Sequence, residues 1–338
     1  MEAYLMTAQV SISPSHIESE LSRIWDSLEG TNKMRACLFN LIFYTKKNER
    51  ASYLQTIAQK VIDKFPSRVI FINADPTSSE NDLKAKVSVL SSASGACDVA
   101  CDRIEIDALG SQQERIPFVI LPHLIPDLPV YLVWGEDPSQ ENPIAIELEK
   151  LATRLIFDSE TTDHLPNFAT SILRHRERSF CDIADLNWAR MGNWREMLSK
   201  TFYSKEKLEL LERAKTLRIC FNSQETAFFC HTNIQATYLQ AWICCQLNWE
   251  LEDLSSEPGT LSFHYRQGKQ PILVELISQK VAGLSSGSIM SLELLTSEQE
   301  HLIFSRDILF PHQILFNYST LQRCELPSKY VFAKSDMG

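Results

Sequence analysis

Apolar positions in the first half of the chain follow two spacings in turn, which predicts helices alternating with buried strands. Residues 14–28 predict an amphipathic helix, because Ile17, Leu21, Ile24 and Leu28 recur every three or four positions. Short apolar runs predict buried strands at 36–44, 68–73, 118–121, 130–134 and 155–157, with helices at 53–65, 144–152 and 168–173. This alternation predicts an α/β domain, in which helices cover both faces of a mostly parallel sheet in three layers.

Two segments of this half have other patterns. The mostly polar stretch at 76–95 contains a short predicted helix at 83–90, and 103–106 predicts an edge strand. The apolar run at 116–134 approaches the length of a membrane span, which is about 20 residues. Its prolines would leave backbone groups without hydrogen-bond partners in lipid. We therefore interpret the run as two buried strands joined by a proline-rich corner, and we expect no membrane association.

The second half of the chain predicts a different architecture. Helical spacing is found at 185–200, 205–215 and 232–247, and strand-like runs at 217–221, 261–265, 272–277, 288–295 and 302–306. Several of these strands flank short polar turns, as in β-hairpins. We therefore expect an α+β domain with antiparallel strands. The expected domains are residues 1–178 and 179–338.

Composition and charge narrow the function classes. The 338 residues are 44% apolar and 22% charged, which is typical of a globular protein. The net charge of −10 argues against nucleic-acid binding, which requires a basic surface. The first residues lack the basic start of a secretory signal. The nine cysteines have neither disulfide-framework nor zinc-site spacing, the nearest approaches being Cys97 with Cys101, Cys230 with His231, and Cys244 with Cys245. We expect free thiols, no metal and a cytoplasmic protein.

Motifs for cofactor binding and catalysis are weak. A dinucleotide site needs glycines after the first strand, but residues 45–50 read Thr-Lys-Lys-Asn-Glu-Arg. Residues 283–287 match G-x-S-x-G, but a strand-like segment follows where a nucleophile elbow needs a helix, so we expect a plain loop. The sequence thus indicates no catalytic residues and no cofactor.

Acidic residues follow three of the predicted strands. Asp75, Glu136, Asp137 and Asp158 would meet at the carboxyl edge of the sheet, where ligands of open α/β sheets bind. They are consistent with a cation site, but acids at strand-to-helix turns more commonly cap helices and close turns. We favour capping.

The segment Arg174–Arg218 is rich in basic residues and contains eleven basic and seven acidic ones. Within this region Trp188, Arg190, Trp194 and Arg195 combine two residue types that are enriched at interface hot spots. The alternative is that the tryptophans pack in a domain core and that the arginines pair with acids of the same chain. We expect at least one tryptophan to be in the core.

Several segments, in order along residues 35–200, resemble one protein family. They are Arg35–Ile42, Pro66–Ile70, Asp127–Trp134, Arg154–Ser159, Asp185–Trp188 and Trp194–Arg195. Together they are similar to OpcA, the glucose-6-phosphate dehydrogenase assembly family. The resemblance implies a non-catalytic bacterial cytoplasmic protein that binds glucose-6-phosphate dehydrogenase, the NADP-linked first enzyme of the oxidative pentose phosphate pathway, and favours its active oligomer as an allosteric activator.

As partner-binding residues we choose Trp188, Arg190, Trp194 and Arg195, because this segment joins the family likeness to interface chemistry. The alternative function is a sugar-phosphate-binding enzyme or sensor that uses the Arg174–Arg218 region as its phosphate site. A protein that binds some other enzyme is a third hypothesis.

Overall fold

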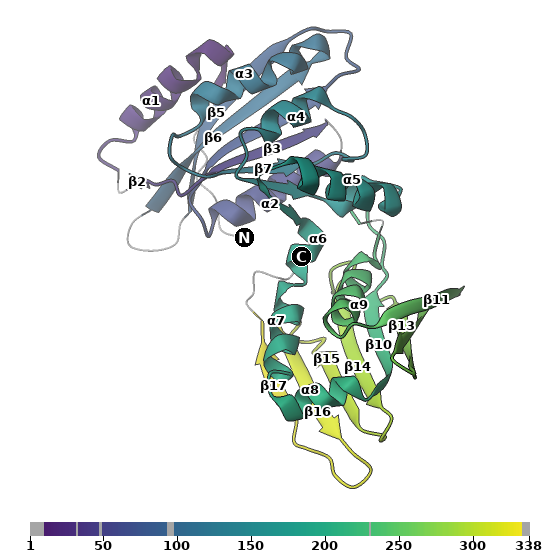
Figure 1. The fold of residues 1–338 in the computed structure, drawn as a ribbon. Coiled ribbons are helices and arrows are strands. Elements are labelled where there is room, and N and C mark those ends of the chain that lie inside the picture. Colours follow the sequence, from purple (N-terminus) through teal and green to yellow (C-terminus); the bar gives the residue numbers. More distant parts are fainter. Residues whose placement is uncertain (1–9, 32, 47–48, 93–97, 230, 333–338) are drawn as a thin grey trace. The chain divides into compact units, whose positions relative to one another are not determined.

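The computed structural model describes residues 10–31, 33–46, 49–92, 98–229 and 231–332. The chain divides into two compact units, Met1–Leu186 and Asn187–Gly338 (Figure 1). We expected the division after Arg178. In the structure the next strand, β9 (Asp182–Asp185), pairs with β8 (Arg154–Phe157) and so continues the sheet of the first unit.

The first unit is built on one mixed sheet. Among the described residues its strand order is β1-β5-β6-β4-β3-β7-β8-β9, and β2 pairs with β6. The pairs β1·β5 and β5·β6 are antiparallel, and the other pairs are parallel. Besides β8 and β9, the strands are β1 (Val10–Ile12), β2 (Lys33–Arg35), β3 (Asn40–Lys46), β4 (Arg68–Asp75), β5 (Leu83–Ser92), β6 (Asp98–Leu109) and β7 (Val130–Trp134).

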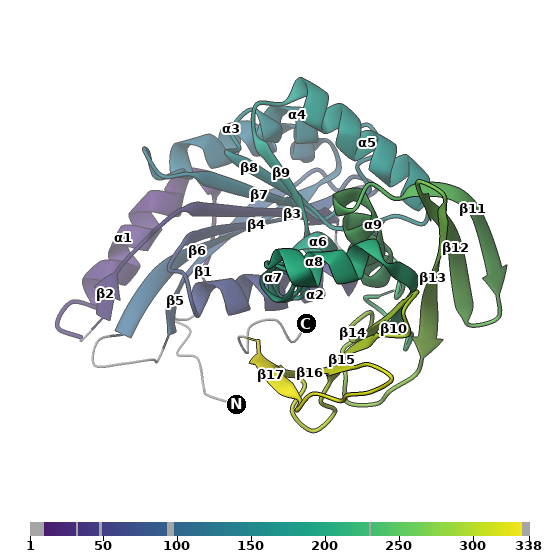
Figure 2. The same cartoon turned by 60° about the horizontal axis from the view of Figure 1, so that its bottom comes forward.

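Helices cover both faces of this sheet, which confirms the expected three layers. Successive side chains of a strand point to opposite faces, so Ile42 and Tyr44 of β3 face one helix layer while Leu41 and Phe43 face the other. Figure 2 shows the two layers on opposite sides of the strands. The first layer contains α1 (Ile17–Ser27), α3 (Ile116–Ile120), α4 (Pro143–Glu149) and α5 (Leu165–Arg178), and the second contains α2 (Glu49–Ile62).

Three expectations for this unit were wrong. The predicted helix at 83–90 is strand β5, and the predicted edge strand at 103–106 is part of β6, which lies between β5 and β4. The predicted strand at 118–121 is the end of α3 and a short 3-10 turn, with Pro117 in the first helical turn, where its missing N–H costs nothing. That turn is Leu121–His123, and the other 3-10 turns of the described residues are Pro14–His16, Gly110–Arg115 and Ser159–Thr161.

The second unit has its own sheet, with strand order β11-β12-β13-β10-β14-β15-β16-β17. The strands pair antiparallel except β10 and β13, which are parallel. This confirms an α+β unit with mostly antiparallel strands. The strands are β10 (Ala214–Asn222), β11 (Glu250–Glu257), β12 (Thr260–Gln267), β13 (Gln270–Gln279), β14 (Ile289–Thr296), β15 (His301–Arg306), β16 (Gln313–Ser319) and β17 (Ser328–Val331).

Four helices accompany this sheet among the described residues. They are α6 (Leu186–Arg190), α7 (Gly192–Thr201), α8 (Lys205–Glu212) and α9 (Ile234–Gln246). Apolar residues of α7, α8 and α9 form one core with the inward residues of the strands. The single helix expected at 185–200 is wrong, because the chain leaves the helical path at Met191, before Gly192, a poor helix former.

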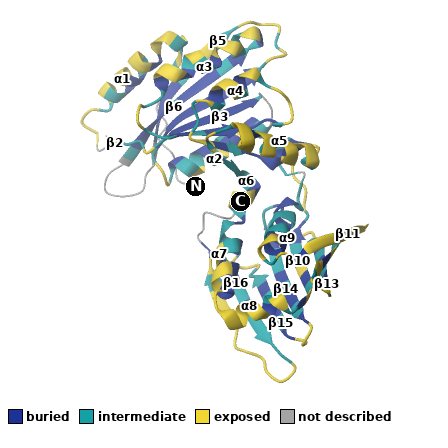
Figure 3. Cartoon of the chain, in the orientation of Figure 1, coloured by how far each residue is buried: buried dark blue, intermediate teal, exposed yellow. Residues whose placement is uncertain are grey.

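Two features of this unit complete the fold. The G-x-S-x-G segment at 283–287 lies in the loop between β13 and β14, as expected. At one edge of the sheet lies β11, a strand whose residues are all exposed (Figure 3). It carries four acids, Glu250, Glu252, Asp253 and Glu257.

Candidate functional site

The place where open α/β sheets bind ligands is the carboxyl edge at the point where the strand order reverses. In the first unit this point lies between β3 and β7. The backbone packs tightly there, because Gly135 donates its N–H to the carbonyl of Tyr44 at 2.8 Å. A Cβ at position 135 would lie 2.6 Å from Cδ1 of Leu54. The chain's own atoms therefore fill the space beside the first βα turn.

Two ion pairs cross this edge of the sheet. Lys46, the last residue of β3, pairs with Glu136 after β7, and its backbone N–H also donates to Glu136 at 2.9 Å. Arg50, in the first turn of α2, pairs with the fully buried carboxylate of Asp158 after β8. These residues fix the turns at the strand ends. Of the β3–α2 turn, Lys47 and Asn48 lie outside the described residues.

The acidic residues at the carboxyl edge act in turns and caps, which confirms the interpretation that we favoured. Asp75 accepts hydrogen bonds from the N–H and hydroxyl of Thr77. Asp137 accepts from the N–H of Ser139 and the hydroxyl of Thr162, each at 2.8 Å. Asp158 caps a 3-10 turn. Within the described part of the chain, no three His, Cys, Asp or Glu side chains come together as metal ligands would.

Two cavities open on this side of the first unit. One, of about 320 Å³, is lined by Tyr44 and Lys46 together with the acids Glu114, Glu136, Asp137 and Glu141. The excess of carboxylates in the lining of this cavity would repel an anionic ligand. The other, of about 340 Å³, lies between α4 and α5, over Leu155 and Phe157 of β8. We name it the α4–α5 groove; it is large enough for a small-molecule ligand.

A charged network lies along the α4–α5 groove. Nδ1 of His175 lies 3.1 Å from Oε2 of Glu149, and Arg178 donates from Nη2 to the His175 ring and, at 3.4 Å, to the same Glu149 oxygen. Burial lowers the pKa of His175, the charge of Glu149 raises it and that of Arg178 lowers it again, and the net pKa is below its usual value. His175 is therefore neutral in the folded protein at neutral pH.

This pKa shift predicts a pH-dependent stability of the first unit. Between the lowered folded-state pKa and the ordinary value near 6.5, the unfolded chain binds more protons than the folded chain, so stability rises with pH across this window. The denaturant concentration at the unfolding midpoint, measured from pH 5 to 7.5, should decrease as the pH is lowered below about 6.5. The slope should flatten in His175→Gln. An unchanged slope in this variant would contradict the assignment to His175.

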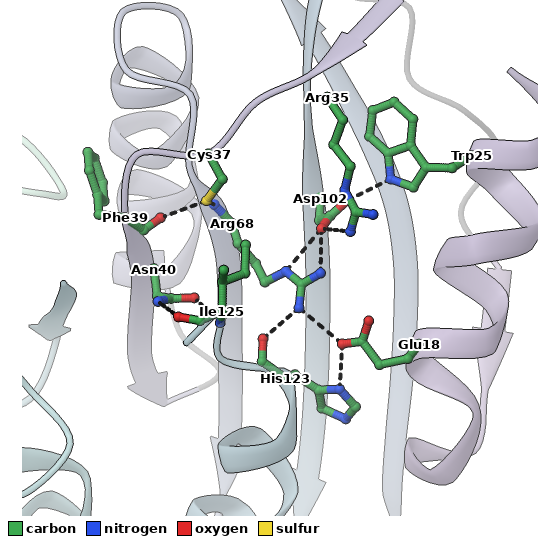
Figure 4. Close-up of polar contacts among 10 residues, drawn as sticks. All are labelled: Glu18, Trp25, Arg35, Cys37, Phe39, Asn40, Arg68, Asp102, His123 and Ile125. Carbon is green, nitrogen blue, oxygen red and sulfur yellow. Dashed lines mark hydrogen bonds and ion pairs between the residues drawn. The ribbon is translucent and has the colours of Figure 1, made fainter. Parts of the chain in front are cut away.

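A buried polar network lies at the opposite, amino-terminal edge of the sheet (Figure 4). Arg68, the first residue of β4, donates from Nε and Nη2 to Asp102 of β6 at 3.0 and 2.7 Å. Its Nη1 donates to Glu18 of α1 and to the carbonyl of His123. Asp102 also accepts from Trp25 of α1 at 2.7 Å and from Arg35 at 2.6 Å. The network joins α1, three strands and the turn after α3.

Sequence reasoning did not find this network, because its partners are distant along the chain. Burial raises the pKa of Asp102, but hydrogen bonds from Arg35 and Trp25 and the charge of Arg68 outweigh it, and the pKa lies below its ordinary value. The carboxylate is thus ionised and fully paired. The network therefore has a structural role at this edge, because ligands of open α/β sheets bind at the other one.

The structure brings two of the four chosen partner-binding residues, Trp188 and Arg195, into contact, whereas Arg190 contacts other residues and Trp194 is buried. The guanidinium of Arg195 lies 3.7 Å from the ring centre of Trp188, and that of Arg190 lies 4.9 Å from the ring of Phe229. Trp188 is 36% exposed. Trp194 is 2% exposed and packs in the core of the second unit.

The arginines of this segment are held by aromatic rings and amides in the described contacts. Arg190 donates to Oδ1 of the buried Asn187 at 2.7 Å. Arg195 has no carboxylate within ion-pair distance among the described residues, and its buried Nε has no acceptor there. Burial lowers the pKa of Arg195. A desolvated cation over a ring gains from cation–π attraction, and it would gain further from an acceptor.

Two thiols, Cys101 and Cys244, are buried. Burial raises the pKa of Cys101 to about 11 and that of Cys244 to about 12, so both stay protonated. Cys97 and Cys230 lie outside the described residues. The pairs Cys97/Cys101 and Cys230/His231 are therefore not tested.

Comparison with known proteins gives the family. A model described as glucose-6-phosphate dehydrogenase subunit N-terminal domain matches residues 58–175, and one described as the C-terminal domain of the same subunit matches residues 181–307. The chain belongs to the OpcA family. The two family models divide the chain between residues 175 and 181, before β9, whereas the contacts divide it after Leu186.

Curated OpcA relatives come from cyanobacteria. The "Putative OxPP cycle protein OpcA" of Synechocystis is 26% identical over 202 residues, which cover 58% of this chain and 41% of the relative. That of Nostoc punctiforme is 24% identical over 247 residues, covering 70% and 51%. The chain thus spans about half the length of the OpcA relatives it matches.

A solved structure with a similar fold is an oxidoreductase from Sinorhizobium meliloti, with 11% identity and a TM-score of 0.49 over 88% of this chain and 78% of that one. No helix in the described ranges of this OpcA family member has the length and apolar character needed to cross a membrane.

Proposed function

We propose that this chain binds glucose-6-phosphate dehydrogenase in the bacterial cytoplasm and, without catalysing a reaction itself, favours the active oligomer of that enzyme. The observation that carries the proposal is the match of both domain models of a dehydrogenase subunit, in order, to the two halves of the chain. The names of the curated relatives support the link to the oxidative pentose phosphate cycle. A protein that binds only the active oligomer shifts the population toward it by its differential affinity.

The direct test uses the dehydrogenase of the same organism, purified with and without this chain. We expect a complex in size-exclusion chromatography with light scattering, a larger dehydrogenase oligomer, and a higher specific activity at equal enzyme concentration. The chain alone, assayed with glucose 6-phosphate and NADP, should show no turnover. Absence of a complex together with unchanged oligomer size and activity would refute the proposal.

We further propose that the exposed side of α6 and the start of α7 contact the dehydrogenase. Trp188 and Arg195 form a stacked pair there, and no described residue offers an acceptor to the Nε of Arg195. Trp and Arg are over-represented among interface residues that dominate binding energy. An acidic side chain of the partner would satisfy the guanidinium while covering the tryptophan ring. Arg190, stacked on Phe229, extends this surface.

Trp188→Ala is expected to weaken dehydrogenase binding about 30-fold, the effect of losing one central interface residue. The reason is that the change removes the ring and the platform of Arg195 together. Tyr203→Ala is the matched control, because Tyr203 is a 91% exposed aromatic residue of the same unit outside this surface. Surface plasmon resonance with immobilised dehydrogenase measures both affinities. Equal affinities for the two variants would exclude Trp188 from the interface.

A further inference from the structure

The α4–α5 groove has the size and lining of a small-molecule site, and the proposed function leaves it unused. Trp134, Leu155 and Phe157 give it an apolar floor, and Ser139, Gln140 and Asn142 add hydroxyl and amide groups from the loop before α4. An apolar floor with a few polar groups is the usual composition of such sites. All of these residues belong to the first unit.

One wall of the groove carries a cation with no ion-pair partner in the described part of the chain. Arg174 and Arg178 lie one turn apart on α5 and both line the groove. Arg178 is engaged with Glu149 and His175. Arg174 is exposed, and among the described residues no carboxylate lies within ion-pair distance of it. A guanidinium with both edges available binds a phosphate or carboxylate through two parallel hydrogen bonds.

The opposite wall carries a buried carboxylate that is only half satisfied. The side chain of Glu149 is 9% exposed, and its Oε2 receives the contacts from His175 and Arg178. Its Oε1 is buried and has no hydrogen-bond donor in the described structure. A buried acceptor without a donor costs about 1–3 kcal/mol, so a donor brought by a ligand is favourable here. Because Arg178 already balances the Glu149 charge, this donor is best a neutral hydroxyl.

We propose that the α4–α5 groove binds a small polyhydroxylated anion. Arg174 holds the anionic end, a phosphate ester or a carboxylate, and Glu149 accepts a hydrogen bond from a hydroxyl. Ser139, Gln140 and Asn142 contact the remaining hydroxyls. The exposed Glu141 at the same loop repels a second negative charge, which favours one anionic group per ligand. This site goes beyond the proposed function and does not depend on it.

The test is titration calorimetry of the full chain alone, with no dehydrogenase present. Glucose 6-phosphate and gluconate are the two anionic probes, and whichever binds more tightly identifies the anionic group. Glucose lacks the anionic group, and inorganic phosphate lacks the sugar hydroxyls. Each should therefore bind at least about 10-fold more weakly, the effect of one lost hydrogen bond to a charged group. Equal binding of glucose or phosphate and the best anionic probe would overturn the proposal, as would the absence of binding by both anionic probes at millimolar concentration.

Arg174→Ala should weaken the anionic probes about 10- to 100-fold and leave glucose unchanged. Arg176→Ala is the matched control, since Arg176 is exposed on the same helix and does not line the groove. Glu149→Gln should weaken the probes through their hydroxyl groups, and circular dichroism shows whether this variant is folded. If Arg174→Ala and Arg176→Ala bind the anionic probes equally, the groove is not their site.

Discussion

Replacing Asp102 by asparagine is expected to destabilise the first unit by about 3 kcal/mol, the lower end of the cost of breaking a buried ion pair. The change leaves the guanidinium of Arg68, whose side chain is 7% exposed, without its main counter-charge. The cost stays near the lower end because Glu18 keeps its contact with Arg68. Urea unfolding followed by tryptophan fluorescence measures the loss, since Trp25 is part of the network.

The pH dependence gives an independent check on Asp102. Its folded-state pKa lies below the unfolded value near 3.9, so its contribution is complete above that value and is lost as pH falls through the folded-state pKa. Asp102→Asn should therefore remove part of the acid sensitivity of the first unit. Asp82→Asn is the control, because the Asp82–Lys84 pair is exposed and should leave the unfolding midpoint unchanged. Similar midpoints for the two variants would refute the structural role of the network.

The second large effect is expected for Trp194→Ala, which should destabilise the second unit by about 3–5 kcal/mol. Trp194 is 2% exposed, and its ring contacts Phe332 with centres 5.9 Å apart. Removing it leaves a cavity in the core between α7 and β17. Thermal unfolding followed by circular dichroism measures the change in the midpoint of the transition that belongs to the second unit. A midpoint equal to that of the unchanged chain would contradict the core placement.

Trp194→Phe separates packing from partner binding. The indole Nε1 is buried and has no acceptor among the residues that the structure describes, so replacing the ring by phenyl loses volume but none of the described hydrogen bonds. We expect a folded second unit with a smaller loss of stability and unchanged dehydrogenase binding. Weakened binding by a folded Trp194→Phe variant would instead return Trp194 to the interface.

The alternating α/β unit could be predicted because its parallel strands are buried on both faces and are therefore continuous apolar runs. The hydrophobic pattern predicted the wrong element type where a segment fits more than one spacing. In Leu83–Leu90 the polar residues Lys84, Lys86 and Ser88 alternate with apolar ones, which is the period of a strand, although we expected a short helix there. In α3, short apolar runs near prolines do not distinguish a strand from a helical turn. Edge strand β11 was missed because both of its faces are exposed and no periodicity arises.

The candidate site was only partly accessible from sequence for a related reason. Residue types singled out the segment that holds Trp188 and Arg195, and in the structure the guanidinium of Arg195 stacks on the Trp188 ring across the break at Met191. The core position of Trp194 depends on β17 and the sheet, which lie far along the chain. Likewise, Arg68 meets Asp102 only through the register of β4 on β6, where Val69 pairs with Arg103. Contacts between distant strands leave no local signal.

The open edge of the second sheet has a consequence for the concentrated protein. A bare strand edge offers its backbone N–H and C=O groups to any extended chain, and two copies could join there into a longer sheet. On β11 the approaching strand of an identical molecule would bring Glu250, Glu252, Asp253 and Glu257 against the same four carboxylates. Arg266 offsets part of the charge of Glu250 and Glu252, and the remaining like charges should oppose such pairing, more effectively at low ionic strength.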